Sequence, residues 1–542
     1  MSAVSTAGEA GEEKPPRVSW WVIGALLALM ALSAVAHLSA LRRDLPLADI
    51  DENYFVDPAV HFAATGDPNP NWFGHPGSTV IYPVAGLIHA WDAVAHDGPI
   101  LGSSSALSRR YEQHPTPFYV LARLWTITLS VATVPLLFLV GRRAFNARVA
   151  LIAAAIWAVV PISAHFGRIV RSDSASVCFG LLALWLCLRL FEEPRTRWCV
   201  GAGLAVGFAI SSRYFMVALL PCLAAAAIVP LRQNPRSAIR AAGIAVGSAL
   251  GGFVLTTPFF LLDWSTARGS LEVQENASQP TAEGLSRLGN LRWYLGTAIP
   301  DTLTWPLVAL AVAGVVLAVW RRRALPLLLA LFCGTFLVGI CLSRLHWQRW
   351  LIPILPVLIL FGAYTVDLIV RRLAATVKGN DRWATAAACV VITGVLAVHP
   401  TMRLIDDIQL VSERSTRSEA REWIVDNAPP GTQIGDDAKN APVDDVNGYT
   451  SRAIDPRNNS LAELQRNGYD YFVTNGLRYG RYASNPDRYP RESAFYLDVA
   501  CNTRLVALFQ PTATHGLPIR IYDLRRQPRM LYDFLCTQRV DS

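Results

Sequence analysis

The sequence predicts a polytopic α-helical membrane protein with a smaller α/β domain at its C-terminal end. Of the 542 residues, 52% are hydrophobic and only 17% are charged, against about a quarter charged in an average soluble domain. Long apolar runs occupy residues 1–400, whereas residues 401–542 have an ordinary globular composition. The basic residues form short clusters between the apolar runs, which is typical of the loops of membrane proteins. The shift in composition near Pro400 therefore predicts two domains, 1–400 and 401–542.

Eleven apolar stretches are candidates for membrane-spanning helices, each of which needs about 20 mostly apolar residues. They are residues 20–41, 118–140, 149–165, 174–191, 198–212, 214–231, 241–261, 302–320, 325–342, 350–370 and 383–399. The first stretch is compatible with a signal peptide, but its length favours a retained anchor. The fifth and sixth are short and are separated by Ser211-Ser212-Arg213, so we expect two short helices that meet below the outer surface.

The basic clusters all fall on one side of an eleven-span alternation. Their members are Arg142, Arg143, Arg148, Arg195, Arg197, Arg232, Arg236, Arg240, Arg321, Arg322, Arg323, Arg371, Arg372, Lys378 and Arg382. The positive-inside rule then predicts a cytoplasmic N-terminus and an extracytoplasmic C-terminal domain. We expect the protein in the plasma (inner) membrane. Segments 42–116, 165–173, 262–301 and 343–349 would lie outside. The same clustering argues against a nucleic-acid partner, which the net charge of +8 alone would permit.

The first external segment, 42–116, is far longer than a simple connection between helices. Within it, residues 78–94 are apolar but interrupted by polar groups, which indicates a helix lying at the membrane interface rather than a span. The acidic pair Asp51-Glu52 follows the first span by about ten residues. A carboxylate at that distance can meet the head group of a lipid-borne substrate, although a solvated acidic turn is an equally simple interpretation.

Three further clusters of polar residues fall in the predicted external segments. The second segment carries Asp173 with Arg168 and Arg171, and the others carry His75 and the group Arg344, His346 and Arg349. Arginines and histidines at an interface suit a phosphate. Each cluster also has a structural explanation, because Asp173 or Ser174 can cap the following helix and arginines commonly extend from the apolar region to the interface.

The C-terminal stretch alternates helix-like and strand-like segments, which predicts a small extracytoplasmic α/β domain. Helices are expected at 418–427 and 461–466, and strands at 433–435, 469–474, 504–509 and 519–522. Cys501 and Cys536 could form a disulfide there. The other seven cysteines lie in or beside apolar runs and are expected to be small buried hydrophobic residues. Asp436, Asp437, Asp444 and Asp445 lack the spacing of a calcium loop, and no metal site or other cofactor is predicted.

One reaction matches these residues. A sugar carried on polyprenyl phosphate already has a good leaving group, so transfer needs a base for the acceptor and cations for the departing phosphate. A single displacement with inversion would use one carboxylate on the face opposite the phosphate. The sequence contains no glycine-rich nucleotide-binding loop.

Over residues 20–400 the sequence resembles the GT-C fold glycosyltransferases, in particular glycosyltransferase family 39, which includes protein O-mannosyltransferases and lipid A aminoarabinose transferases. The features that carry the resemblance are Asp51-Glu52-Asn-Tyr-Phe, Gly66-Asp67-Pro-Asn-Pro70 running to Phe73-Gly-His75-Pro76, Arg123 with Gly141-Arg-Arg143, and Arg349-Trp-Leu-Ile-Pro353-Ile-Leu-Pro356. The chain departs from the family in having Gly77 after His75-Pro76 and Trp350 after Arg349.

The resemblance implies a membrane glycosyltransferase whose partners are a polyprenyl-phosphate sugar donor, the lipid bilayer and an envelope acceptor, which is a protein, lipid or polysaccharide. Asp51 would be the catalytic base, Glu52 would support it, and Asp173 would be an acid near the substrates. The arginines and histidines of the three clusters would bind the donor phosphate, and family members of this type work without a metal.

Two alternatives remain open. A transporter or flippase of lipid-linked sugars should carry charges within its spans and repeated halves, and Arg213 is the main candidate for such a charge. The chain could also be a membrane-anchored binding protein whose C-terminal domain is the active part.

Overall fold

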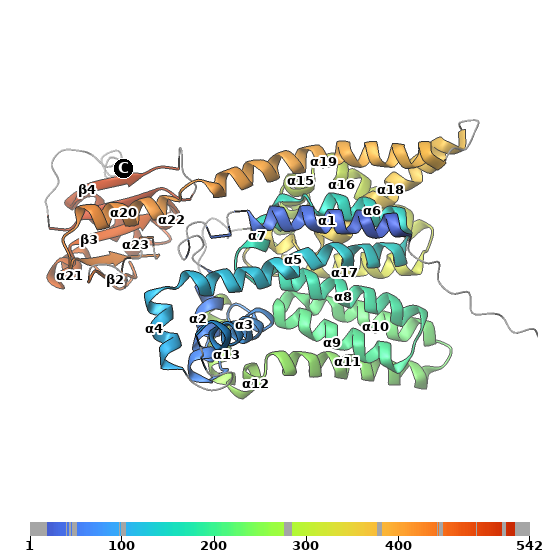
Figure 1. Ribbon diagram of the computed structural model, residues 1–542, viewed down its shortest axis with the longest axis horizontal. Helices are drawn as coiled ribbons and strands as arrows, with labels where there is room; N and C mark the ends of the chain where they lie inside the picture. The colour runs from blue at the N-terminus through green and yellow to red at the C-terminus, as the bar shows by residue number, and fades with distance from the viewer. Residues whose placement is uncertain are drawn as a thin grey trace, which may run out of the picture.

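The structure is a computed structural model in which a helical bundle is joined to a small sheet domain by one long helix (Figure 1). It describes residues 19–39, 41–42, 45, 51–96, 98, 104–275, 285–376, 382–438, 440–441, 443, 448–483, 485–511 and 516–525. The joining helix is α19 (Arg382–Ser412). This arrangement confirms the predicted fold class, a polytopic helical membrane protein with an α/β domain after it.

All eleven predicted stretches are helical over most of their length. They correspond to α1 (Trp20–Leu38), α5 (Thr116–Ala144), α6 (Ala147–Trp157) with α7 (Pro161–Arg168), α8 (Asp173–Glu192), α9 (Thr196–Ser212), α10 (Leu220–Ile228), α11 (Pro235–Thr256), α15 (Ile299–Leu303) with α16 (Trp305–Trp320), α17 (Ala324–Cys341), α18 (Leu355–Thr376) and α19. Among the described residues, seven helices are long and apolar enough to cross a membrane, and two bent pairs raise that number to nine. Neither α9, with 17 residues, nor α18 is among them.

Proline and an unusual backbone angle explain the two bent pairs. The axis turns by 62° between α6 and α7, and Pro161 begins α7, where a residue without an N–H costs nothing. The second bend, of 116°, separates the segment Arg287–Leu303, which includes α14 (Arg287–Trp293), from α16. It falls at Thr304, whose φ of 70° lies in the left-handed region and ends the helix before it.

Helices α9 and α11 pack unusually close together because glycines face the contact. A Cβ added at Gly203 would lie 2.3 Å from the carbonyl oxygen of Ala245, and one added at Gly207 would lie 2.4 Å from that of Ala249. The glycines are four residues apart, so they lie on one face of α9. This spacing of small residues is a common way for membrane helices to approach each other.

The first loop folds into three helices that cover one end of the bundle. They are α2 (Asn53–Thr65), α3 (Ser78–His96) and α4 (Ser105–Gln113). The buried face of α3, including Val80 and Val84, packs in one core with residues of α2 and α5. Although α3 has 19 residues, it is not among the helices apolar enough to span a membrane. With α12 (Phe259–Leu262) and α13 (Trp264–Glu275), these helices lie at the end of the bundle nearer the sheet domain (Figure 1).

The C-terminal domain is a five-stranded mixed sheet with strand order β2-β1-β3-β5-β4. Strand β1 (Gln433–Asp436) runs parallel to β2 (Thr450–Ala453) and β3 (Tyr471–Asn475), whereas β5 (Ile519–Asp523) runs antiparallel to β3 and β4 (Arg504–Phe509). Four of these strands and the helices α20 (Thr416–Asn427) and α21 (Leu461–Arg466) occupy predicted segments. Strand β2 and the helices α22 (Gly476–Ala483) and α23 (Pro490–Asn502) were not predicted.

Several sequence predictions for the C-terminal region are refined by the structure. Helix α19 continues through Pro400 to Ser412, so the predicted boundary at residue 400 falls inside a helix. The seven cysteines of the apolar runs are free. Cys501 is disulfide-bonded, but Cys536 lies outside the described residues, so their pairing stays a prediction.

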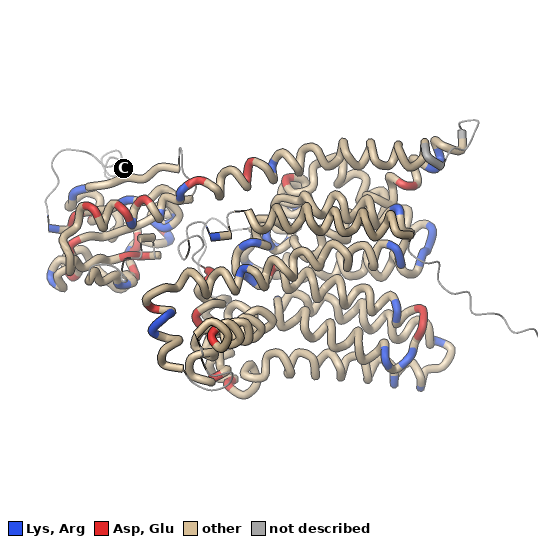
Figure 2. The backbone as a smooth tube through the Cα atoms, in the orientation of Figure 1, with Lys and Arg blue, Asp and Glu red and all other residues tan. Residues whose placement is uncertain are grey.

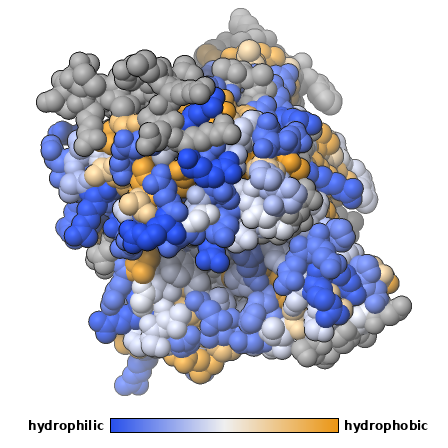
Figure 3. Space-filling view, turned by 90° about the vertical axis from the view of Figure 1, so that its left-hand side faces the viewer, coloured by the Kyte–Doolittle hydropathy of each residue, from blue (hydrophilic) through white to orange (hydrophobic). Residues whose placement is uncertain are grey.

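Charge is unevenly distributed over the bundle. In Figure 2 the middle of the bundle is largely free of charged residues, and many Lys and Arg residues gather at the end away from the sheet domain. Figure 3 views the opposite end, where hydrophilic side chains from the sheet domain and the loop helices cover much of the visible surface. A charge-poor middle between charged ends is the pattern that a bilayer requires.

Candidate active site

A cavity of about 1580 Å³ lies where the helical bundle meets the C-terminal domain. All four segments predicted to be external contribute to its lining, together with α19 and the C-terminal domain. Its charged and histidine side chains are Asp51, His75, His165, Arg171, Asp173, Arg213, Arg287, Asp301, Arg344, Arg349, His399, Arg403, Asp407, Arg478 and Arg481. Segments far apart in the sequence therefore form one cavity, rich in charged side chains, at the end of the bundle.

Asp51 lies on the cavity wall directly before α2. Its Oδ2 is 2.6 Å from Nη1 of Arg171 and 3.7 Å from Nη1 of Arg349. The side chain is 24% exposed, so the carboxylate is accessible from the cavity. Three segments that the sequence analysis singled out separately thus meet at one carboxylate.

Glu52, in contrast, faces away from the cavity and is completely buried. Arg123 of α5 donates two hydrogen bonds to it, from Nε to Oε1 and from Nη2 to Oε2, both 2.8 Å long. The backbone N–H of Val170 donates a third, also of 2.8 Å, to Oε1. A paired bidentate contact of this kind is among the strongest polar contacts in proteins. Glu52 therefore ties the start of α2 to α5 and to the loop before α8.

Asp173 is buried at the start of α8, also on the cavity wall. Its Oδ1 is 2.8 Å from Nη2 of Arg213, and its Oδ2 is 3.6 Å from Nε of Arg171. The expected alternative role as a helix cap is not observed, because Ser172 is the N-cap residue and makes no side-chain cap hydrogen bond. Ser174 instead accepts a hydrogen bond from Ser130 of α5. Arg171 thus lies between the two carboxylates, Asp51 and Asp173.

From the sequence, Arg213 was predicted only as a charge within a membrane span, under the transporter alternative. It lies at the break between α9 and the helical turn Tyr214–Leu219, in extended backbone with φ of −155° and ψ of 123°. This break directs its guanidinium to Asp173. The interruption of the apolar pattern at Ser211-Ser212-Arg213 was the signal in the sequence for this position.

His75 also lines the cavity and belongs to a group of aromatic rings. Its ring centre is 5.2 Å from that of Tyr54 and 6.1 Å from that of Trp72. Burial lowers the pKa of His75 and raises the pKa of Tyr54, so both side chains are held in their neutral forms. The unusual Gly77 is explained by packing, because a Cβ there would lie 2.3 Å from the ring of Phe55.

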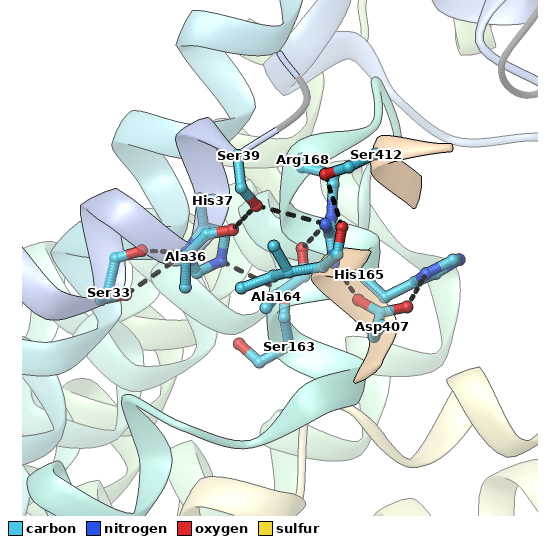
Figure 4. Close-up of polar contacts among 11 residues, drawn as sticks. Ser33, Ala36, His37, Ser39, Ser163, Ala164, His165, Arg168, Asp407 and Ser412 are labelled. Atoms are coloured by element: carbon cyan, nitrogen blue, oxygen red, sulfur yellow. Dashed lines mark hydrogen bonds and ion pairs between the residues drawn. The ribbon is translucent and has the colours of Figure 1, made fainter. Parts of the chain in front are cut away.

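The remaining predicted phosphate ligands divide between the cavity and other places. Arg344 lines the cavity. Arg168 and His346 do not: Arg168 is paired with Asp407 of α19, and His346 packs edge-on against Trp293 with ring centres 4.5 Å apart. His165 Nδ1 also lies 3.0 Å from Asp407. Figure 4 shows Asp407 of α19 between His165 and Arg168 of α7. These contacts fasten α19 to the bundle.

The C-terminal domain supplies cavity residues that sequence reasoning missed, namely Ala438, Leu477, Arg478 and Arg481. The last three belong to α22, which was not predicted. No short-range pattern connects α22 with Asp51, since more than 400 residues separate them. Among the described residues, no group of three or more His, Cys, Asp or Glu side chains is arranged to hold a metal ion.

Comparisons with known proteins bear on the fold. Residues 120–261 match the family described as dolichyl-phosphate-mannose-protein mannosyltransferase. The structure resembles ArnT from Cupriavidus metallidurans in the apo state, with a TM-score of 0.55, 14% identity and coverage of 93% of this chain and 98% of that one. It also resembles the Archaeoglobus fulgidus oligosaccharyltransferase, with a TM-score of 0.54, 13% identity and coverage of 92% and 74%. No curated protein matches by sequence.

The alignments with both solved structures include nearly the whole of this chain, so they extend beyond the helical bundle into the domain after it. The family match falls on the segment from α5 to α11, which contains Arg171, Asp173 and Arg213. The chain therefore has the GT-C fold of these membrane glycosyltransferases.

Proposed function

We propose that this protein is an integral membrane glycosyltransferase that moves a sugar from a polyprenyl-phosphate donor to a cell-envelope acceptor, with Asp51 as the general base. The observation that carries the proposal is the position of Asp51, a carboxylate on the wall of a large cavity rich in charged side chains, with Arg171 and Arg349 beside it. Such a site offers one proton acceptor and several cations, which are the groups that the reaction needs.

In the proposed reaction the acceptor hydroxyl attacks the anomeric carbon of the donor sugar. The new C–O bond forms as the hydroxyl proton passes to the carboxylate of Asp51. The bond between the anomeric carbon and the phosphate oxygen breaks, and its electron pair leaves with the polyprenyl phosphate. Because this is one displacement on the face opposite the phosphate, the sugar inverts its anomeric configuration.

Arg213, Arg344 and Arg349 are the proposed ligands of the departing phosphate. Arg213 and Arg349 are adjacent, since Nη1 of Arg213 lies 3.4 Å from the backbone oxygen of Arg349. Guanidinium groups suit this role because they stay charged and present several donors in one plane. Among the solved structures with this fold, one is ArnT bound to undecaprenyl phosphate and one is an archaeal oligosaccharyltransferase in complex with a dolichol-phosphate.

Glu52 and Asp173 are proposed to position the residues that contact the substrates. Glu52 positions Asp51 through its contacts with Arg123 and the Val170 N–H. Asp173 holds Arg171 and Arg213 in place. The proposed orientation puts the cavity and the C-terminal domain on the extracytoplasmic side, because the arginine-rich loops lie at the other end of the bundle (Figure 2).

The test compares envelope glycans and lipid-linked sugars, by mass spectrometry, in strains that carry the wild-type protein, Asp51→Asn or no copy. We expect Asp51→Asn to match the deletion strain, with the glycan missing and the lipid-linked donor accumulating. Asp67→Asn is the matched control, because Asp67 is an exposed carboxylate of the same loop that does not line the cavity. Normal glycan in the Asp51→Asn strain would refute the role of Asp51.

A second measurement on the same strains distinguishes an enzyme from a flippase. An enzyme defect leaves the donor on the outer leaflet with its sugar attached, whereas a flippase defect leaves it on the inner leaflet. Accessibility of the accumulated lipid-linked sugar to an added sugar oxidant in intact cells distinguishes these outcomes.

A further inference from the structure

The C-terminal domain places two arginines of α22, Arg478 and Arg481, on the wall of the same cavity as Asp51. Arg478 is close enough to Tyr54 for its charge to act on the phenol, opposing the effect of burial on the pKa of Tyr54. Tyr54 is three residues after Asp51 and also lines the cavity. Arg478 therefore lies near the proposed base at the junction of the two domains, and Arg481 lines the same cavity.

Helix α22 is held firmly in this position. It starts directly after β3, where the side chain of Asn475 accepts a hydrogen bond from the backbone N–H of Arg478 at 3.0 Å. Asn475 in turn donates to Asn440, and Asn440 donates to both Asp436 and Asp437. Asp437 also accepts hydrogen bonds from Thr474 and Tyr496. This buried network fixes the start of α22 at the carboxyl ends of the parallel strands.

The whole domain is also fastened to the bundle through α19. Asp407 is held by His165 and Arg168 of α7 (Figure 4). Nearby, Nη1 of Arg403 donates to the backbone oxygen of Asp301 at 2.9 Å. Since α19 leads directly into the C-terminal domain, these contacts hold that domain over the cavity.

The charge of the cavity exceeds what the donor alone can neutralise. Eight arginines and four aspartates are among the described residues that line it. The aspartates near the base are already paired, Asp51 with Arg171 and Arg349, and Asp173 with Arg213. A sugar polyprenyl phosphate is a phosphodiester and carries one negative charge. Within the described part of the chain, Arg478 makes no side-chain hydrogen bond or ion pair, and its charge acts on the buried carboxyl group of Asp437. Without a direct partner, its guanidinium can pair with a second anion.

We infer that the acceptor carries an anionic group, a phosphate or a carboxylate, and that Arg478 binds this group to bring the acceptor hydroxyl to Asp51. Arg481 adds positive charge beside it. This inference rests on the proposed function and names the chemistry of its second substrate. Arg478 is thus a positioning residue for the acceptor, distinct from the arginines proposed to bind the donor phosphate.

The test uses the full-length protein with Arg478→Glu, Arg478→Gln and Arg478→Lys. We expect Arg478→Glu to reduce the envelope glycan by about tenfold or more, and Arg478→Lys to keep most of it, because a charge-assisted contact needs the cation. Arg466→Glu is the matched control, because Arg466 is an exposed arginine of the same domain outside the cavity. Stabilisation of the purified protein against heat by added undecaprenyl phosphate should be unchanged in every variant.

Three results would overturn the inference. One is a normal glycan level in both Arg478→Glu and Arg478→Gln. A second is an acceptor in which mass spectrometry finds no anionic group near the glycosylated hydroxyl. Where an anionic group is present, the same spectra distinguish a phosphate from a carboxylate. Loss of heat stabilisation by undecaprenyl phosphate in Arg478→Gln would also contradict it, because Arg478 would then serve the donor. If Asp51→Asn abolishes the glycan while the Arg478 variants keep it, only this inference fails.

Discussion

At the residue scale, neighbouring acids in the first loop have different environments. Asp51 is accessible from the cavity, whereas Glu52 is fully buried and paired with Arg123. In the sequence the two carboxylates are adjacent, and only the family resemblance assigns the base to Asp51 and the supporting role to Glu52. The structure separates them, because the turn before α2 points one side chain to the cavity and the other to α5. The environment of Asp51 therefore suits proton transfer, and that of Glu52 suits holding the loop in place.

The buried pair gives a prediction for stability. Arg123→Ala leaves Glu52 buried without its cation, which costs about 3–5 kcal/mol in comparable pairs. Arg268→Ala is the control, because Arg268 pairs with Glu272 on the surface, where such pairs contribute about 0–1 kcal/mol. Thermal unfolding of the purified proteins should show a large loss for Arg123→Ala and little change for Arg268→Ala. Equal shifts would mean that the buried pair does not hold the loop.

At the element scale, the contact between α9 and α11 gives a second prediction. Gly207→Ala should lower the melting temperature, because the added Cβ would lie 2.4 Å from the backbone oxygen of Ala249. Gly201→Ala on the same helix should be neutral or slightly stabilising, because its Cβ would meet only the side chain of Leu186 at 3.7 Å and alanine favours helix by about 1 kcal/mol. Similar melting temperatures for the two variants would contradict the close packing.

The elements that the sequence predicted are those with a strong local pattern. Apolar runs marked the helices of the bundle, and strand-like stretches rich in aromatic and β-branched residues marked β3 and β5, which are buried along their whole length. Strand β2 is only four residues long and partly exposed, so it has no such pattern. Helix α22 is a single short amphipathic stretch after a strand. The composition shift near Pro400 marks the end of an apolar run, whereas α19 continues through the proline to Ser412.

At the scale of the whole molecule, the candidate site could be predicted only in part. Asp51, Arg171, Asp173 and Arg349 were recognised from their external position and from family motifs, and they do meet in one cavity. Arg168 and His346 have the same residue types at similar positions, yet they contact Asp407 and Trp293 instead. The contribution of α22 depends on how the two domains pack, and the sequence carries no local signal for that contact.

The proposed orientation gives a third prediction at this scale. The test introduces one cysteine at each end of the molecule, as Asn427→Cys or Gln233→Cys. Asn427 is exposed on α20, and Gln233 is exposed in the arginine-rich loop before α11. A membrane-impermeant maleimide should label the first in intact cells and the second only after permeabilisation. Labelling in the reverse order would place the cavity on the cytoplasmic side and would contradict the proposed function.

The central claim is that Asp51 removes the proton of the acceptor hydroxyl. The most direct measurement is the rate of sugar transfer by purified Asp51→Asn protein to the acceptor that the glycan comparison identifies, alongside its affinity for the lipid donor. Loss of a general base predicts a rate lower by about 10²–10⁴-fold, with donor affinity close to that of the wild type. A transfer rate within a few-fold of the wild type would contradict the claim.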